Sequence, residues 1–239
     1  MILDKVNTPD DVKKLSIREM NSLADEMREL IIKKVNTIGG HMGPNLGIIE
    51  TTIAMHYVFN SPVDKVVFDV SHQTYPHKML TGRAFGFLDE ERYDDITGYS
   101  CPEESEHDFF NVGHTSTSIS LASGLAKARD LRRETENVIA IIGDASLDGG
   151  EAFEALNCAS EITGNLIVII NDNEMSIPEN HGALGKHLKD LRLSAGTLPN
   201  NFFKALGFQY LLVEKGNDIE AVIKALNHVK DTKVPVVVH

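Results

Sequence analysis

The sequence is poor in features that mark several large classes of protein. It has only two cysteines among 239 residues, Cys101 and Cys158, and no metal-ligand spacing joins them. No apolar run approaches the roughly 18 residues that a membrane helix needs, and the N-terminus is polar. We therefore expect reduced thiols, with Cys158 as a small core residue, no signal peptide, no membrane association and a cytoplasmic location.

Basic residues are also scarce. The chain has 23 Lys and Arg against 35 Asp and Glu, which gives a net charge of −12. This balance argues against a surface for nucleic acid or anionic membranes. A diphosphate bound by such a chain would depend on a metal ion, backbone amides and helix N-termini. A dinucleotide-binding fold is not expected either, because no Gly-x-Gly-x-x-Gly follows a predicted strand.

What is present is the pattern of an ordinary globular α/β protein. Apolar residues make up 42% and charged residues 24% of the chain, and the length favours a single domain over residues 1–239. The predicted strands and helices alternate, which favours a three-layer fold with a mostly parallel sheet and helices on both faces. Helices are predicted at 16–38, 47–59, 116–132, 151–162, 184–191 and 218–230, and strands at 66–70, 138–142, 166–170, 208–213 and 234–239. Because the last strand closes the sequence, we expect the natural chain to continue or to be truncated there.

Polar residues follow two of these strands directly. Asp144 comes after the apolar run 138–142, and Asn173 comes after the run 166–170, 29 residues further along the chain. Ligands of open α/β sheets collect at the carboxyl ends of the strands. A carboxylate and an amide oxygen at that edge suit a hard cation such as Mg²⁺, which would in turn hold a diphosphate. From the spacing alone, a pair of polar strand-end residues that only cap turns is equally open.

The residues around these strand ends form a larger pattern. Gly143-Asp144-Ala145 followed by Asn171-Asp172-Asn173 is similar to the thiamine diphosphate motif, in which Gly-Asp-Gly precedes a distant Asn. With this motif, the chain resembles the 1-deoxy-D-xylulose-5-phosphate synthase family of the transketolase superfamily over residues 15–239. The segments that carry the resemblance are 40–43, 69–78, 81–83, 112–120, 154–157 and 173–177.

The resemblance implies a role for individual residues of this chain. Asp144 and Asn173 match the side-chain ligands of Mg²⁺, and Met175 matches a ligand that acts through its backbone carbonyl. The implied contacts with thiamine diphosphate come from His72, Gly113, His114, Thr115, Asp144, Ala145, Ser146 and Asn173. The implied catalytic residues are His41, His72 and His114.

The resemblance also implies a reaction and partners. Family members are transferases of isoprenoid biosynthesis that join pyruvate to glyceraldehyde 3-phosphate with thiamine diphosphate and Mg²⁺. This chain matches only their first, diphosphate-binding domain, and the pyrimidine-binding and C-terminal domains are absent from it. We therefore expect a homodimer, a partner chain with the pyrimidine-binding domain, or both, and a chain that is incomplete for catalysis alone.

Three departures from the family pattern keep alternatives open. Ala145 replaces the usual Gly, a long insert is missing between Gly185 and Leu198, and the segment 215–218 lacks the family's His. One alternative is the N-terminal subunit of a transketolase-type ketol transferase. The other is a non-catalytic module for cofactor binding or dimerisation.

The remaining polar residues have weaker patterns. His56 is expected to pack on its helix, and His77 is open between a structural and a functional role. Lys78 and Arg83 would meet a phosphate or form a solvated pair, and the acidic stretch 89–108 is expected to be a solvated surface. The histidines without a supporting pattern, expected at the surface, are His107, His181, His187 and His228.

Overall fold

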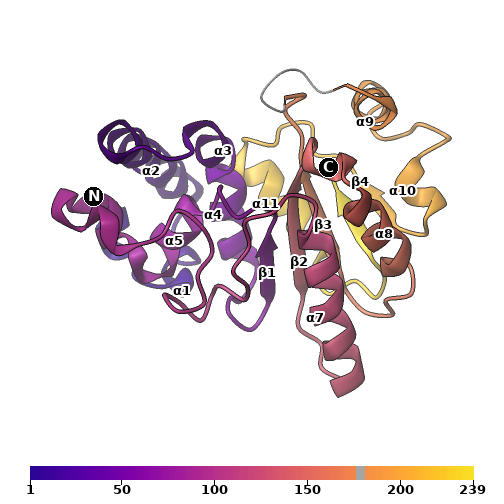
Figure 1. Ribbon diagram of the computed structural model, residues 1–239, viewed down its shortest axis with the longest axis horizontal. Coiled ribbons are helices and arrows are strands. Elements are labelled where there is room, and N and C mark those ends of the chain that lie inside the picture. The colour runs from indigo at the N-terminus through magenta and orange to yellow at the C-terminus, as the bar shows by residue number, and fades with distance from the viewer. Residues whose placement is uncertain (176–180) are drawn as a thin grey trace. The chain divides into compact units, whose positions relative to one another are not determined.

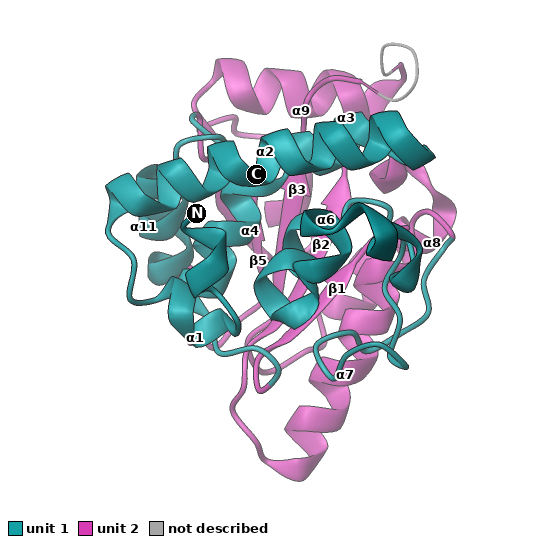
Figure 2. Ribbon diagram, turned by 90° about the vertical axis from the view of Figure 1, so that its left-hand side faces the viewer, with its two compact units in different colours: residues 1–62, 71–113, 215–228 teal, residues 63–70, 114–214, 229–239 magenta. Residues whose placement is uncertain are grey.

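The structure is a computed structural model that describes residues 1–175 and 181–239. These residues form two compact units (Figure 2). Unit 1 contains residues 1–62, 71–113 and 215–228, and unit 2 contains residues 63–70, 114–214 and 229–239. The last residues of the 173–177 motif lie outside the described part of the chain.

Unit 2 is built on a sheet of five parallel strands (Figure 1). The strands are β1 (Lys65–Phe68), β2 (Val138–Gly143), β3 (Ile167–Asn171), β4 (Gln209–Leu211) and β5 (Val236–Val238). Their order is β1-β2-β3-β5-β4, so the last strand of the chain lies between β3 and β4. The predicted parallel sheet is therefore confirmed, and each predicted strand is found within a few residues of its expected place.

The two central strands form because their apolar runs are buried on both faces. Residues 138–142 of β2 and residues 167 and 168 of β3 are 0% exposed, and Ile169 and Ile170 of β3 are 6% and 3% exposed. β2 and β3 pair in parallel, with Gly143 opposite Asn171 at the end of the register. The polar residues that follow both strands consequently leave the sheet at the same edge.

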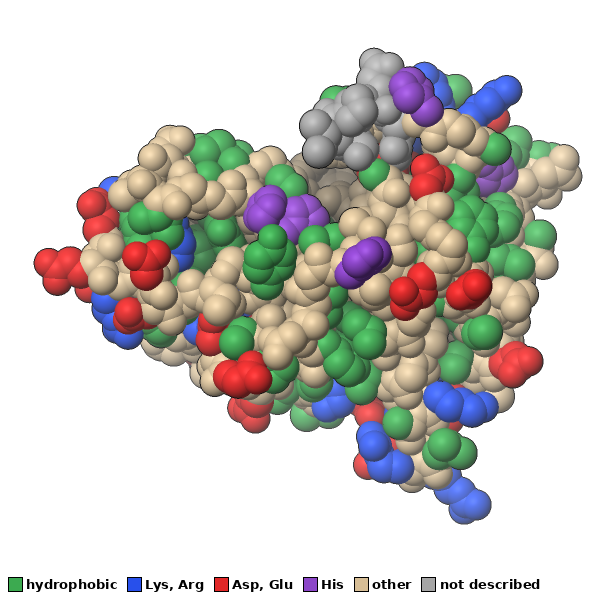
Figure 3. All heavy atoms as spheres, in the orientation of Figure 1, with side chains coloured by type: hydrophobic (Ala, Val, Ile, Leu, Met, Phe, Trp, Pro, Cys, Tyr) green, Lys and Arg blue, Asp and Glu red, His purple; other side chains and the backbone are tan. Residues whose placement is uncertain are grey.

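The described residues of unit 2 include the helices α7 (Ser118–Arg132), α8 (Gly150–Ala159), α9 (Ala183–Leu193) and α10 (Phe202–Ala205). On α8 the buried residues are Ala152, Ala155, Leu156 and Ala159, a stripe with helical spacing. Cys158 is off this stripe and exposed, so its predicted core position is wrong. Basic side chains gather at the C-terminal end of α7, where they complement the helix dipole (Figure 3).

Unit 1 is mainly helical. Its helices are α1 (Pro9–Val12), α2 (Ile17–Ile38), α3 (Met42–Leu46), α4 (Ile49–Val58), α5 (Tyr75–Lys78), α6 (Phe85–Leu88) and, up to residue 228, α11 (Ile219–Val229). Helix α2 begins at the predicted capping box, in which Ser16 and Glu19 bond to each other's backbone N–H, and it ends at Gly39 with φ of 85°. No described helix has the length and apolar character needed to cross a membrane.

A buried polar network lies in unit 1, where the sequence suggested a solvated surface. The Arg83 guanidinium donates to both oxygens of Asp108, at 2.7 and 3.0 Å, and Lys78 forms an ion pair with Glu104. Lys78 is 0% and Arg83 4% exposed, so the solvated-pair alternative is wrong for both. The expectation of a solvated surface fails for Asp108, which is 5% exposed. Ion pairing explains how these charges tolerate burial.

Two histidines extend this network. The Nε2–H of His77 donates to Asp108 at 3.1 Å, and the Nε2–H of His56 donates to Nδ1 of His77 at 2.9 Å. Both rings are 1% exposed and stacked, and burial lowers the pKa of each, so both are neutral at pH 7. Burial alone would raise the pKa of Asp108, but its hydrogen bonds with His77 and Arg83 lower it. His77 is thus held inside this buried network, and His56 packs as expected.

Candidate functional site

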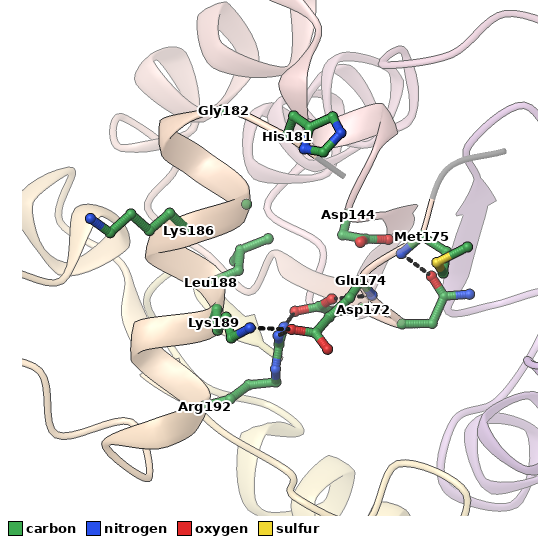
Figure 4. Close-up of a pocket in the computed structure, with 12 residues that line it drawn as sticks. Asp144, Asp172, Glu174, Met175, His181, Gly182, Lys186, Leu188, Lys189 and Arg192 are labelled. Carbon is green, nitrogen blue, oxygen red and sulfur yellow. Dashed lines mark hydrogen bonds and ion pairs between the residues drawn. The ribbon is translucent and has the colours of Figure 1, made fainter. Parts of the chain in front are cut away.

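A pocket of about 450 Å³ lies where β2 and β3 end (Figure 4). One wall comes from the residues after the two strands, and the other comes from the start and one face of α9. All of its lining residues belong to unit 2. They are Asp144, Asp172, Asn173, Glu174, Met175, His181, Gly182, Gly185, Lys186, Leu188, Lys189 and Arg192.

The three candidate metal ligands all line this pocket. Asp144 is 4% exposed, and its backbone N–H donates to the carbonyl of Asn171 at 3.3 Å, which ties the end of β2 to that of β3. The side-chain oxygen of Asn173 accepts the backbone N–H of Met175 at 3.0 Å. An amide oxygen has two lone pairs, so one remains for a cation. The donor set of carboxylate, amide and backbone carbonyl is the hard oxygen chemistry that Mg²⁺ takes.

Histidine, cysteine and acidic side chains alone do not form a metal centre. Within residues 1–175 and 181–239, no group of three or more of them is arranged to hold an ion. An ion in this pocket would therefore need amide and carbonyl oxygens as well as carboxylate. The residues after β2 and β3 fit that requirement.

The turn after Asp144 leads into helix α8. Ala145 has φ of −68°, so the alanine in place of the family's glycine needs no left-handed backbone. Gly149 is required by packing within the chain rather than by the approach of a phosphate, because a Cβ at this position would lie 1.9 Å from Oγ of Ser116. Gly150 opens α8 without a side-chain cap and has open space around it. Backbone N–H groups at the start of α8 are thus available for an anion.

Asp69, at the end of β1, fixes the turn that contains His114 and Thr115. Its two carboxylate oxygens each accept one backbone N–H at 2.9 Å, from Ser116 and Ser118. The hydroxyl of Ser116 in turn donates to the carbonyl of Ser146 at 2.7 Å. The candidate cofactor turn is therefore bonded to the turn that follows Asp144. His114 itself is exposed, and its Nδ1–H donates to the carbonyl of Thr115 at 2.8 Å.

The other two candidate histidines lie together in unit 1. The rings of His41 and His72 have centroids 5.2 Å apart in an edge-to-face arrangement, and Tyr99 lies 5.8 Å from His41. Asn45, which is 0% exposed, holds their backbones together. Its amide nitrogen donates to the carbonyls of His41 and His72, at 2.6 and 2.8 Å, and its oxygen accepts the N–H of Tyr75.

A strained turn precedes His72. Val70 and Ser71 have φ of 57° and 65°, which is rare for a β-branched residue and for two consecutive residues without glycine. The Ser71 hydroxyl holds this conformation by donating to the carbonyl of Val112 at 2.7 Å. Such strain is common at functional sites, where surrounding bonds impose it.

A second group of polar side chains begins in the pocket lining and extends beyond it to His239 and Tyr210. The Arg192 guanidinium forms ion pairs with Asp172 and Glu174. On the other side of Asp172, the Nε2–H of His239 donates to its carboxylate at 2.7 Å, and the Tyr210 hydroxyl donates to Nδ1 of His239 at 2.6 Å. Burial lowers the pKa of His239, and a neutral ring satisfies both of these bonds. Burial also lowers the pKa of Arg192, while the Asp144 carboxylate opposes this change.

The α9 wall was missed from the sequence, although a signal was present. Gly185, Leu188, Lys189 and Arg192 are spaced as one helix face. The first three lie within the helix predicted at 184–191, and Arg192 follows it directly in the longer observed helix. His181, expected only at the surface, is exposed but also lines the pocket. Lys189 and Arg192 form ion pairs with Glu174, and Arg192 also pairs with Asp172. Lys186 lines the pocket as well, but its side chain is directed away from these carboxylates (Figure 4).

Comparisons with known proteins agree with the resemblance seen in the sequence. A profile of the 1-deoxy-D-xylulose-5-phosphate synthase family matches residues 3–198 and 192–239. A curated 1-deoxy-D-xylulose-5-phosphate synthase from Pelotomaculum thermopropionicum is 40% identical over 273 positions, covering 100% of this chain and 43% of its own length. One from Listeria monocytogenes is 46% identical over 241 positions, covering 98% of this chain and 40% of its own. The chain thus spans about two-fifths of these relatives.

These alignments also locate the missing insert. The alignment with the Pelotomaculum relative has 273 positions for the 239 residues of this chain, and the profile match divides at residues 192–198. The Listeria relative aligns over only 241 positions, so the insert is short or absent there too.

Solved structures show the same fold. A transketolase from Pichia stipitis superposes with a TM-score of 0.69 at 20% identity, over 93% of this chain and 36% of that one. A transketolase from Campylobacter jejuni gives 0.67 at 21%, over 94% and 37%. The expected three-layer α/β fold is confirmed.

Proposed function

The chain belongs to the 1-deoxy-D-xylulose-5-phosphate synthase family, and we propose that it is the thiamine diphosphate- and Mg²⁺-binding portion of such a transferase. The observation that carries this proposal is that Asp144, Asn173 and Met175 line the same pocket at the ends of β2 and β3. The fold-level likeness to transketolases at 20–21% identity gives weaker support to a ketol transferase of transketolase type.

Asp144, Asn173 and the Met175 carbonyl would hold Mg²⁺ in this pocket, and the ion would screen the charge of a diphosphate. Backbone N–H groups near Ala145, Ser146 and the start of α8 would bind the phosphate oxygens. Such contacts suit a chain with a net charge of −12, in which a metal ion supplies the positive charge.

The proposed roles of the histidines follow from their chemistry. When bound, thiamine diphosphate supplies the carbon nucleophile that attacks a carbonyl and stores the resulting charge. His41, His72 and His114 would donate protons to substrate oxygens or accept protons from them. His72, Gly113, His114 and Thr115 would also contact the cofactor. Hydrogen bonds from Asn45 fix the backbones of the first two histidines, and Asp69 fixes the turn at His114.

The proposed substrates are pyruvate and glyceraldehyde 3-phosphate, as the family name implies. The relatives are more than twice as long as this chain. We propose that residues 1–239 form one diphosphate-binding domain, and that a pyrimidine-binding domain, in a longer chain or a partner chain within a dimer, completes the catalytic site. Alone, this chain would bind cofactor without turnover. Both cysteines are free, which suits the proposed cytoplasmic location.

Titration calorimetry with thiamine diphosphate, with and without Mg²⁺, tests the proposal. We expect saturable binding that requires Mg²⁺ and is abolished in Asp144→Ala. Asp148→Ala is the matched control, because this neighbouring aspartate does not line the pocket. Absence of Mg²⁺-dependent heat in the unmodified chain would favour a non-catalytic module, and normal affinity in Asp144→Ala would refute the metal site.

A further inference from the structure

One arginine on α9 spans the segment that carries two of the three candidate metal ligands. Arg192 pairs through one terminal nitrogen with Asp172 and through the other with Glu174. These are the residues on either side of Asn173. Figure 4 shows the side chain reaching from α9 across the pocket to both carboxylates.

The segment adopts a conformation that needs support. Glu174 has φ of 62°, in the left-handed region that non-glycine residues seldom occupy. This residue turns the chain between Asn173 and Met175, and so sets the direction of the Met175 carbonyl. The local bonds are single N–H donations within the segment, from Glu174 to Asp172 and from Met175 to Asn173, each at 3.0 Å.

The two carboxylates that Arg192 joins differ in burial. The Asp172 side chain is 3% exposed and is also held by His239, which Tyr210 orients. The Glu174 side chain is 57% exposed. Arg192, whose side chain is 27% exposed, therefore joins a fixed carboxylate to a solvent-facing one across Asn173.

We propose that Arg192 is a positioning residue for the metal–diphosphate site, acting through Asp172 and Glu174 rather than by touching the ion. It holds the oxygens of Asn173 and Met175 in the arrangement that coordinates a divalent ion, and this ion in turn carries the diphosphate. This inference rests on the proposed function of the pocket. Outer partners of metal ligands commonly have such a role.

A general effect of charge must be separated from positioning. A metal–pyrophosphate complex is an anion, so loss of a nearby positive charge also weakens its binding. Arg192→Lys keeps the charge, but an ammonium group cannot span two carboxylates as a planar guanidinium does. Positioning predicts that both Arg192→Lys and Arg192→Leu lose affinity, whereas charge alone predicts a loss only for leucine.

The test is titration calorimetry of the full chain with Mg²⁺ and inorganic pyrophosphate. We expect Arg192→Leu to bind about 10- to 100-fold more weakly, and Arg192→Lys to lose most of that amount. The matched control is Arg132→Leu. Arg132 also pairs with two glutamates, but at the C-terminal end of α7 and outside the pocket lining. Its affinity should equal that of the unmodified chain.

The possible outcomes separate the two proposals. Without Mg²⁺-dependent pyrophosphate binding by the unmodified chain, the proposed function fails and this inference fails with it. Normal binding by the unmodified chain and by Arg192→Lys overturns the positioning role alone. If circular dichroism shows that the Arg192 variants are unfolded, Glu174→Gln replaces them, because its side chain is exposed. It should weaken binding about 2- to 5-fold, the effect of one ion pair, and an unchanged affinity would overturn the inference.

Discussion

Asp69 provides the sharpest test of how the candidate cofactor turn is held. Its buried carboxylate is 1% exposed and accepts the backbone N–H groups of Ser116 and Ser118, at 2.9 Å each. Ser118 is the first residue of α7, and Thr117, the residue before it, provides no side-chain cap. Asp69, which follows strand β1, therefore caps the start of helix α7 from a distant part of the chain. Asp69→Ala would leave the backbone N–H groups of Ser116 and Ser118 without an acceptor.

The magnitude follows from these two bonds. Each buried N–H without a partner costs about 1–3 kcal/mol, and the lost negative charge at a helix N-terminus adds about 0.5–1 kcal/mol. We expect Asp69→Ala to lower the free energy of unfolding by about 3–5 kcal/mol. Asp69→Asn keeps one accepting oxygen and should cost about 2 kcal/mol.

Guanidinium unfolding followed by circular dichroism measures this change, and hydrogen exchange locates it. The amides of Ser116 and Ser118 should lose protection in Asp69→Ala before the rest of α7 does. Asp25→Ala, an exposed change on α2, should stay within about 0.5 kcal/mol of the unmodified chain. The reasoning is refuted if Asp69→Ala costs under about 1 kcal/mol and both amides stay protected.

Three further predictions concern packing and pH. Because burial lowers the pKa of His56 and His77 in the native chain, the unfolded chain takes up protons at higher pH, and stability should fall on acidification below about pH 6.5, by up to about 1.4 kcal/mol per pH unit for each ring. Urea unfolding between pH 7.5 and 5 measures it, and His56→Gln should show a shallower dependence. Gly149→Ala should lower the free energy of unfolding by about 1–3 kcal/mol, because the new methyl group collides with Ser116. In a double-mutant cycle with Ser116→Gly, the double variant should lose less stability than the sum of the two single variants. Asn45→Ala should cost about 3–5 kcal/mol in chemical unfolding, since it removes three hydrogen bonds, one buried and two part-buried, from a residue that is 0% exposed.

The parts of the fold that the sequence predicts well depend on local signals. The apolar runs before Asp144 and Asn173 needed only burial to become strands, and the parallel register brought their ends to one edge. The start of α2 at Ser16 followed from its capping box with Glu19. Cys158 was placed wrongly even though its position off the apolar stripe of α8 was legible in the spacing.

The parts that the sequence could not predict depend on distant partners. The sequence left Lys78 and Arg83 open between a phosphate contact and a solvated pair, because their carboxylate partners, Glu104 and Asp108, lie in an acidic stretch with no periodicity. The pairing of Arg192 with the residues around Asn173 joins a helix to a strand end 18 to 20 residues earlier. No local pattern encodes such contacts, because they arise only when the sheet and its helices pack.

The central claim is that a divalent ion between Asp144 and Asn173 tethers a diphosphate. The most direct measurement is ³¹P magnetic resonance of thiamine diphosphate bound to the chain with Mn²⁺ in place of Mg²⁺. The account predicts that Mn²⁺ strongly broadens both phosphorus signals of the bound cofactor, that diamagnetic Mg²⁺ in its place leaves them sharp, and that Asp144→Ala shows no bound signal with either ion. It is contradicted if the cofactor binds the unmodified chain while its phosphorus signals stay sharp, since the ion and the diphosphate would then occupy separate places.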